Sequence, residues 1–229
     1  NIFNKKIDVI FHFAAQAGVR YSLINPRSYI ESNTLGFFNL IESAKKNKIS
    51  KFFYASSSSV YGDSNKFPLK ENDKINPKNM YGLTKKNNEE IAEIFLKNSK
   101  IRAVGLRFFT VFGEWGRPDM LIYKYLESIF NKRKNFYLNN YGNHTRDFTY
   151  IKDVCEIMYK LLYRKNKFNH QVFNICSNKP IKITSILKII DSYFDKKPKI
   201  IKREFQLADV KKTHGSNNKI KKFIKKKKF

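Results

Sequence analysis

The sequence predicts an α/β protein in which helices cover a parallel sheet, because strand and helix signals alternate along the chain. Residues 8–15 (DVIFHFAA) form a nearly continuous apolar run, which is typical of a strand buried on both faces. Residues 33–46 follow, with apolar side chains spaced for one broad helix face. This succession of strand and helix indicates a layered fold.

The alternation continues through the middle of the chain and loosens beyond residue 113. Strands are predicted at residues 51–57 and 102–110, with a helix carrying Tyr81 and Lys85 between them. Five shorter elements follow, namely helices at residues 120–130, 151–162 and 184–194 and strands at residues 135–138 and 171–175. This second part is predicted to be a smaller region threaded back on the first.

The charge of the chain is strongly positive, because 46 Lys and Arg against 19 Asp and Glu give a formal net charge of +27. A basic nucleic-acid-binding protein is one interpretation of such a charge. The lysines are spread along every segment, however, which favours solvated faces and no nucleic-acid partner. Only residues 219–228 form a dense basic block, and such blocks are typical of disordered tails.

Cysteine and histidine usage predicts neither a disulfide nor a metal site. Cys155 and Cys176 lie in apolar stretches without a pairing pattern, which predicts buried free thiols in a reducing, cytoplasmic environment. The four histidines have no metal-ligand spacing, so no metal is expected. No apolar run approaches the ~18 residues of a membrane span, and no membrane partner is predicted.

Tyr81 and Lys85 are four residues apart, so on a helix they point the same way. The ammonium would favour the phenolate and bring a pKa near ~10 toward working pH, which makes Tyr81 a candidate general base. An isolated Tyr-x-x-x-Lys pair is more often part of a solvated helix face. The serine run at residues 56–59 favours catalysis, because a hydroxyl at the end of the preceding strand can share the substrate's hydrogen bond with the tyrosine.

Further motifs surround this pair, in order along nearly the whole chain. They are residues 12–18 (HFAAQAG), 31–36 (ESNTLG), 56–62 (SSSSVYG), 81–85 (YGLTK), 107–113 (RFFTVFG), 116–120 (GRPDM) and 146–150 (RDFTY). Taken together, they resemble the extended short-chain dehydrogenase/reductase family of NAD-dependent sugar-nucleotide epimerases and dehydratases. Within that family, the resemblance is closest to the UDP-glucuronate 4-epimerase branch.

This resemblance implies a Rossmann-like, doubly wound parallel sheet with a smaller substrate-binding region, and NAD as the cofactor. Residues 1–113 would be a partial NAD-binding domain with the catalytic Tyr and Lys, and residues 114–229 mainly the substrate-binding region, with a basic tail from about residue 219. The family holds the pyrophosphate on a Gly-rich turn after its first strand, but the first glycine here is Gly18. We therefore expect a fragment that lacks the first strands of the sheet and part of the C-terminus, and the choice between NAD and NADP stays open.

Carried over position by position, the resemblance implies that Ser57, Tyr81 and Lys85 are catalytic. Tyr81 would take the proton of the sugar 4-hydroxyl, Ser57 would hydrogen-bond the same oxygen, and Lys85 would also hold the nicotinamide ribose. Ser58 is an alternative to Ser57, because a serine run does not define its own register. The residues implied to bind the cofactor are Ala14, Ala15, Gln16, Tyr81 and Lys85. For the first three of these, a tight exit from the strand is the alternative interpretation.

The residues implied to bind the substrate are Ser58, Ser59, Thr110, Arg117 and Arg146. Arg146 would contact the nucleotide diphosphate, while Arg117 and Thr110 would receive the carboxylate of a uronate, in keeping with the forked donors of arginine. A surface arginine in a loop is the alternative for Arg117. Arg20 is expected to reach the same pocket, to pack on a helix or to contact a phosphate. Asn33 is expected to be structural, as a helix-initiating or locally hydrogen-bonded residue.

The positions after the catalytic hydroxyl distinguish the reactions of this family. Dehydratases place an Asp-Glu pair there and the decarboxylating branch a Glu, whereas this chain has Ser58 and Ser59. The expected reaction is therefore NAD-dependent 4-epimerisation of a UDP-sugar, UDP-glucuronate to UDP-galacturonate, through a transient 4-keto intermediate. The alternatives are action on another nucleotide sugar, as an epimerase or dehydratase, and a catalytically inactive fragment. A nucleotide sugar is the expected ligand, and the complete protein is expected to be a homodimer.

Overall fold

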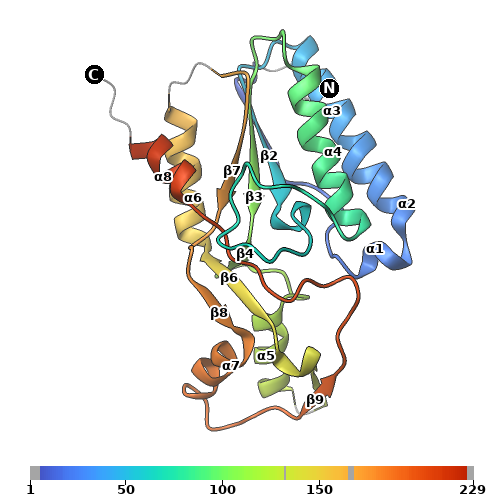
Figure 1. The fold of residues 1–229 in the computed structure, drawn as a ribbon, viewed down its shortest axis with the longest axis vertical. Helices are drawn as coiled ribbons and strands as arrows, with labels where there is room; N and C mark the ends of the chain where they lie inside the picture. Colours follow the sequence, from blue (N-terminus) through green and yellow to red (C-terminus); the bar gives the residue numbers. More distant parts are fainter. Residues whose placement is uncertain (1–5, 132, 165–167, 226–229) are drawn as a thin grey trace.

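The computed structural model describes residues 6–131, 133–164 and 168–225. Its main sheet has four parallel strands in the order β1–β2–β3–β7 (Figure 1). These strands are β1 (Val9–His12), β2 (Lys51–Ser57), β3 (Arg102–Phe108) and β7 (His170–Ile175). Most side chains of β2 and β3 are buried, as their apolar runs predict. The predicted α/β fold with a parallel sheet is confirmed.

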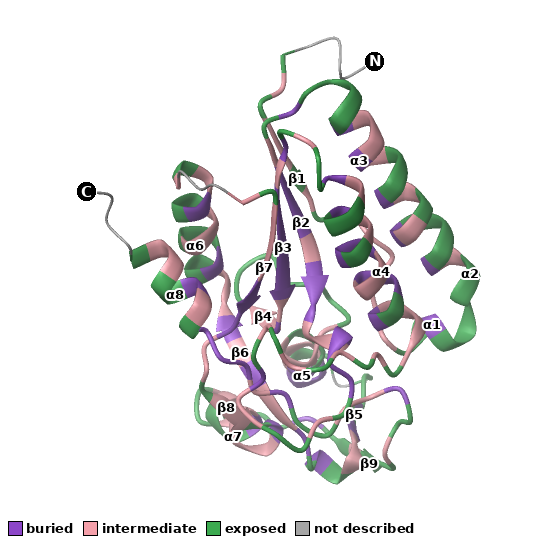
Figure 2. Cartoon of the chain, turned by 45° about the horizontal axis from the view of Figure 1, so that its top comes forward, coloured by how far each residue is buried: buried purple, intermediate pink, exposed green. Residues whose placement is uncertain are grey.

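Helices cover both faces of this sheet, and each turns one buried side toward it (Figure 2). One face carries α3 (Gly36–Lys46) and α4 (Met80–Phe95), and the other carries α6 (Ile151–Tyr163) and α8 (Asn218–Lys225). Because β7, α6 and α8 follow residue 113, the second half of the chain completes the sheet that the first half begins. No helix in the described parts of the chain is long and apolar enough to cross a membrane.

Short helical segments lead from β1 into α3. They are α1 (Tyr21–Ile24), α2 (Pro26–Tyr29) and the π-helical turn η2 (Ile30–Leu35). The helix predicted over residues 33–46 therefore starts inside this turn and is regular only from Gly36. π-Helical turns are rare and frequently occur at functional sites.

A smaller region lies beyond the carboxyl ends of the main strands, in the lower half of Figure 1. Its strands form two small sheets, β4–β6–β8 and β5–β9. Their bounds are β4 (Thr110–Phe112), β5 (Phe136–Asn139), β6 (Thr145–Tyr150), β8 (Pro180–Lys182) and β9 (Ile200–Arg203), and the associated helices are α5 (Leu121–Phe130) and α7 (Ile183–Asp191). Ligands of open α/β sheets bind at the carboxyl ends of the strands, so the junction of the two parts is the place to look for a site.

The strand predicted over residues 102–110 is divided in the structure. β3 ends at Phe108 and pairs with β7, whereas β4 begins at Thr110 and pairs with β6. The buried Phe109 lies between them, where the chain leaves one sheet for the other. A continuous apolar run in the sequence does not record this change of partner, which places Thr110 at the junction.

Two predictions about individual segments are wrong. The basic tail is not disordered over residues 218–225, because Ile220, Phe223 and Ile224 recur at helical spacing and pack against α6 and β7 as part of α8. The rest of that tail, residues 226–229, lies outside the described residues. Cys155 is exposed, since it follows the buried Val154 on α6 and faces outward, whereas Cys176 is buried as predicted.

Candidate active site

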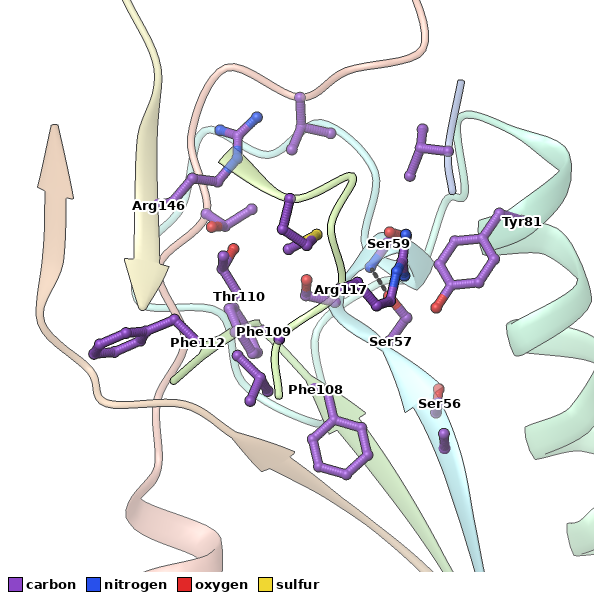
Figure 3. A pocket seen from close by; sticks show the side chains of 18 of the residues that line it. Ser56, Ser57, Ser59, Tyr81, Phe108, Phe109, Thr110, Phe112, Arg117 and Arg146 are labelled. Atoms are coloured by element: carbon purple, nitrogen blue, oxygen red, sulfur yellow. Dashed lines mark hydrogen bonds between the residues drawn. The ribbon is translucent and has the colours of Figure 1, made fainter. Parts of the chain in front are cut away.

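The serine run and Tyr81 meet at the carboxyl end of β2 (Figure 3). β2 ends at Ser57, whose Oγ accepts a hydrogen bond from the backbone N of Ser59 at 3.1 Å as the chain enters a 3-10 turn, η3 (Ser58–Val60). Tyr81 lies in the first turn of α4, and Gly82 lets this helix begin against the serine turn. A Cβ at Gly82 would lie 2.6 Å from the carbonyl oxygen of Ser59. The glycine after Tyr81 therefore allows the close approach that brings the phenol to the serines.

Lys85 lies one turn after Tyr81 and is 3% exposed. Its Nζ donates to the carbonyl oxygen of Ala55 at 2.8 Å and lies 5.8 Å from the centre of the Tyr81 ring. Burial lowers the pKa of Lys85 to about 8. The amine is thus held beside the phenol, on the face of α4 that the i, i+4 spacing predicts.

Burial also raises the pKa of Tyr81, and the neighbouring Ser57 hydroxyl and Arg117 guanidinium act against that increase. The sequence pattern predicts a pKa lowered by Lys85. In the structure, burial has the largest effect on this pKa, while the Lys85 Nζ is hydrogen-bonded to the Ala55 carbonyl oxygen and lies 5.8 Å from the centre of the Tyr81 ring. The charged group that opposes burial comes from a different element, the loop that carries Arg117.

A buried ion pair, which the sequence motifs do not reveal, fastens α4 to the main sheet. Arg107 on β3 donates from Nε to Oε1 of Glu89 at 2.9 Å and from Nη2 to Oε2 at 2.7 Å. Both side chains are nearly inaccessible, at 5% and 6% exposure. Glu89 also accepts a hydrogen bond from the Ser56 hydroxyl, and Nη1 of Arg107 donates to the Tyr61 hydroxyl at 2.9 Å. All the charge of this pair is therefore satisfied inside the protein.

The position of Glu89 shows what this pair does for the site. Tyr81, Lys85 and Glu89 follow each other at intervals of four residues along one face of α4. Lys85 and Glu89 are bonded to Ala55 and Ser56, the two residues before Ser57. The register of the helix against β2, and with it the approach of Tyr81 to Ser57, is set by these bonds. The recurring spacing of four was the available sequence signal for Glu89.

Asn33 connects the segment after β1 to α4. Its side chain accepts from the backbone N of Gln16 at 2.7 Å and donates to the Gln16 carbonyl oxygen at 3.0 Å and to Oγ1 of Thr84 at 3.2 Å. Asn33 is 1% exposed and lies within η2, so it bridges distant segments and does not initiate a helix. Ala14, Ala15 and Gln16 follow β1 closely, as predicted, and are not among the residues that line the two cavities beside Tyr81.

Two cavities of about 530 Å³ and 930 Å³ open beside Tyr81. The smaller one contains every sequence-predicted substrate residue together with two of the three catalytic candidates (Figure 3). These lining residues are Ser57, Ser58, Ser59, Tyr81, Thr110, Arg117 and Arg146. Tyr81, Thr110, Arg117 and Arg146 also line the larger cavity, so the two are parts of one binding region. Lys85 lines neither and lies behind Tyr81.

Arg146 is a partly buried cation whose side chain, among the described residues, is hydrogen-bonded only to backbone carbonyl oxygens. Its Nη1 donates to the carbonyl oxygens of Thr145 and Lys211 at 3.0 and 3.1 Å. Burial lowers its pKa to about 10, Asp209 opposes this, and Arg20 adds to it. A desolvated guanidinium that is bonded to carbonyl oxygens is well suited to bind an anionic ligand.

Arg20 reaches the larger cavity, and its partner is Asp209. Nη2 and Nε of Arg20 lie 2.8 and 3.3 Å from the two carboxylate oxygens of Asp209. No local sequence pattern connects Asp209 with Arg20, since they are 189 positions apart. Asp209 lines both cavities.

Arg117 lies in the loop of residues 113–119, between β4 and α5, beside Ser57, Ser59 and Tyr81 in Figure 3. Its Nε donates to Oδ1 of Asp119 at 2.9 Å, and its Nη2 donates to Oδ2 of the same carboxylate. The two side chains are 48% and 52% exposed. The side chain of Arg117 is therefore about half-exposed and lines both cavities.

Both carboxylates that line the smaller cavity, Glu114 and Asp209, have partners. Glu114 accepts from the Tyr150 hydroxyl at 2.9 Å and pairs with Lys152 at 3.1 Å, and Asp209 pairs with Arg20. Neither stands free to move a proton. Among the described residues, no group of three or more His, Cys, Asp or Glu side chains is placed to hold a metal ion.

Proteins similar to this chain in sequence or fold include nucleotide-sugar enzymes. An uncharacterized protein of Methanocaldococcus jannaschii is 42% identical over 225 residues, which are 98% of this chain and 68% of that protein. A probable UDP-glucuronate 4-epimerase of Rhizobium meliloti is 43% identical over 155 residues, 67% of this chain and 45% of that protein. The crystal structure of UDP-glucuronic acid 4-epimerase from Bacillus cereus, in complex with UDP-glucuronic acid and NAD, matches with a TM-score of 0.90 at 29% identity, over 97% of this chain and 71% of that chain.

The profile of the NAD dependent epimerase/dehydratase family matches residues 1–176. That match includes all four strands of the main sheet and the serines, Tyr81, Lys85, Arg117 and Arg146. The chain spans less than half of the Rhizobium protein and about two thirds of the Methanocaldococcus one. With the fold, the residues of the cavity and the sequence match in agreement, the chain belongs to the NAD-dependent epimerase/dehydratase family.

Proposed function

We propose that the protein inverts C4 of a UDP-sugar in an NAD-dependent reaction and that its substrate is UDP-glucuronate, converted to UDP-galacturonate. The observation that carries the proposal is the shared cavity: a tyrosine paired with a buried lysine and a serine opens onto the same space as Arg117 and Arg146. The names of the Rhizobium and Bacillus proteins support the choice of sugar.

Tyr81 is the proposed base of the reaction. It takes the proton of the sugar 4-hydroxyl while Ser57 donates a hydrogen bond to the same oxygen, and it returns the proton when the 4-keto sugar is reduced. Bound NAD supplies the group that accepts the hydride from C4 and gives it back. Inversion requires the ring to present its other face between the two steps, and the joined cavities beside Tyr81 support such a movement.

The residues around the 4-position support epimerisation over elimination or decarboxylation. Ser58 and Ser59 carry hydroxyls where an eliminating enzyme needs carboxylates, and Glu114 and Asp209 are engaged with Tyr150, Lys152 and Arg20. No free carboxylate among the described lining residues of the smaller cavity stands ready to protonate a leaving hydroxyl.

The chain carries residues that fit the nicotinamide end of NAD. Lys85 uses one of its three N–H donors on Ala55, so two remain for the hydroxyls of a ribose beside Tyr81. Ala14 and Ala15 offer small side chains at the carboxyl end of β1, where the backbone can approach a cofactor, with Gln16 next to them. The pyrophosphate needs a Gly-rich turn, which this sequence does not contain.

Arg146 and Arg117 are proposed to bind the two anionic parts of the substrate. The partly buried Arg146, which within the described parts of the chain is bonded only to carbonyl oxygens, suits the diphosphate. Arg117 and Thr110, next to the serines, suit the carboxylate of the uronate. In this proposal residues 1–113 form the cofactor side and residues 114–229 mainly the substrate side of the enzyme.

The test of the function is the reaction itself, in the chain joined to the NAD-binding N-terminal segment of a family member. UDP-glucuronate is expected to equilibrate with UDP-galacturonate without net consumption of NAD, as followed by NMR of the sugar and by absorbance of the cofactor. Release of water or carbon dioxide as the main outcome contradicts the proposal. Epimerisation of a different nucleotide sugar in preference would retain the reaction and reject the substrate.

We also propose that the protein forms a homodimer through the outer surface of α3 and α4. Leu83 and Ile94 lie on one face of α4 and are 37% and 76% exposed, and Phe38 of α3 packs against Phe95 with ring centres 5.4 Å apart. Light scattering should give twice the 27.1 kDa of the chain. Ile94→Glu is expected to halve that mass, and the control Tyr159→Glu, on the opposite helix layer, to leave it unchanged. A monomer before substitution contradicts the proposal.

A cytoplasmic location is proposed as well. Its support is that Cys155 and Cys176 are free thiols, which persist in reducing compartments. Cell fractionation tests it, and recovery of the protein outside the cytoplasm would reject it.

A further inference from the structure

The loop of residues 113–119 already contains a carboxylate in the place where a uronate would bind. Both forked donors of Arg117, Nε and Nη2, are occupied by the two carboxylate oxygens of Asp119. This two-point geometry is one that arginine frequently uses to bind a carboxylate. Asp119 itself lines the larger cavity, and Arg117 lines both.

The presence of Asp119 on Nε and Nη2 of Arg117 affects the binding of charged sugars and neutral sugars differently. Asp119 occupies the Nε and Nη2 pair among the five N–H donors of Arg117, so a uronate that binds to this pair must displace Asp119, which is an exchange of one carboxylate for another. A neutral hexose has no group that competes for the fork, so the Arg117–Asp119 pair stays as it is. The pair is suited to exchange, because both side chains are about half-exposed and such pairs are weak.

The charge of Asp119 persists under ordinary conditions. Arg117 lowers the pKa of Asp119 below its usual value, so the carboxylate is ionised wherever the enzyme is expected to work. An incoming uronate therefore meets both a competitor for Arg117 and a like charge beside it. Both effects act on the charged sugar alone.

We propose that Asp119 is a specificity-determining residue, which holds the fork of Arg117 until a sugar carboxylate replaces it and so sets how strongly a uronate is preferred over a neutral hexose. This inference rests on the proposed function, since it assumes that Arg117 receives the carboxylate of the substrate. In this inference, competition from the Asp119 carboxylate keeps the preference for a uronate over a neutral hexose smaller than Arg117 alone would make it.

The test compares the affinities of the chain for UDP-glucuronate and UDP-glucose, measured by isothermal titration calorimetry. Asp119→Asn is expected to tighten UDP-glucuronate binding by about two- to fivefold, the range of an exposed ion pair, and to leave UDP-glucose unchanged. Asp119→Glu keeps the charge and is expected to behave like the unaltered chain. The emission of Trp115, the only tryptophan and two residues from Arg117, reports the loop directly.

Two further variants separate competition for Arg117 from a general change of charge. Glu114→Gln removes the same charge from the same loop but from a residue paired with Tyr150 and Lys152, so it should leave the ratio of the two affinities unchanged. In the double variant Asp119→Asn/Arg117→Ala, the gain should disappear. Thermal unfolding of each variant shows that the fold is retained.

A rise in the preference for UDP-glucuronate in Asp119→Asn alone supports the inference, and an unchanged or reduced preference, or equal tightening of both sugars, overturns it. If Arg117→Ala leaves the preference unchanged, the assignment of Arg117 in the proposed function fails, and the inference fails with it. If Arg117→Ala abolishes the preference while Asp119→Asn changes nothing, the inference alone fails. Absence of binding of both sugars to the unaltered chain rejects both.

Discussion

Replacing Tyr81 with phenylalanine is expected to lower kcat by about 10²- to 10⁴-fold, the range that a positioned general base contributes. The variant keeps the aromatic ring, which meets Tyr29 edge-on at 6.3 Å between ring centres, so the shape of the cavity is retained. It loses the oxygen that accepts the proton of the 4-hydroxyl. Turnover of UDP-glucuronate falls while its binding changes little, as measured by steady-state kinetics in the chain completed with an NAD-binding segment and by calorimetry.

The matched control is Tyr125→Phe. The Tyr125 hydroxyl donates to Asp191 at 2.6 Å, and the residue lines neither cavity. Its loss should reduce the free energy of unfolding by about 1.5–3 kcal/mol, the contribution of one hydrogen bond to a charged group, with kcat unchanged. Near-normal turnover in Tyr81→Phe would move the base to another residue.

Arg117→Ala is expected to lower kcat/KM for UDP-glucuronate by about ten- to a hundredfold, because a charge-assisted hydrogen bond contributes about 1.5–3 kcal/mol. Asp119, no longer neutralised, adds repulsion to that loss. UDP-glucose has no carboxylate and should be hardly affected. Arg146→Ala should instead reduce the processing of both sugars alike, since both carry the diphosphate.

The contrast between the two arginine variants decides the substrate. Parallel kinetics with UDP-glucuronate and UDP-glucose measure it, and the two residues serve as controls for each other, as both are arginines that line the same cavities. Equal losses for both sugars in Arg117→Ala would place that arginine on the nucleotide or in the fold. The main argument for UDP-glucuronate as the substrate, in place of a UDP-sugar without a carboxylate, would then fail.

Local patterns were sufficient for most of the fold and for the residues next to Tyr81. Residues 51–57 form β2 as predicted, and the helix of Tyr81 and Lys85 forms because a repeat of four residues defines one helix face wherever the helix packs. The serine run lies at the end of its strand, as the apolar, strand-like stretch before it predicts. In each case the decisive contact is with a neighbour in sequence or across one helix turn.

Long-range pairing accounts for what the sequence did not predict. The break at Phe109 follows from β3 and β4 choosing different partner strands, which depends on residues more than 30 positions away. The order of α8 follows from a face that packs against β7 and α6, although its lysines suggest disorder. The pairing of Arg20 with Asp209 joins segments whose proximity exists only in the folded chain. The amino-acid composition and the spacing of motifs along the chain do not reveal such contacts.

Glu89 and Arg107 also constrain how this protein can change by mutation. Removing one partner of a buried ion pair costs about 3–5 kcal/mol, a large part of the ~5–15 kcal/mol by which a domain is stable. Loss of either charge alone therefore removes a large share of that stability, and we expect the two positions to change together. The helix that carries the base thus depends for its stability on one position of β3, Arg107, which lines neither cavity.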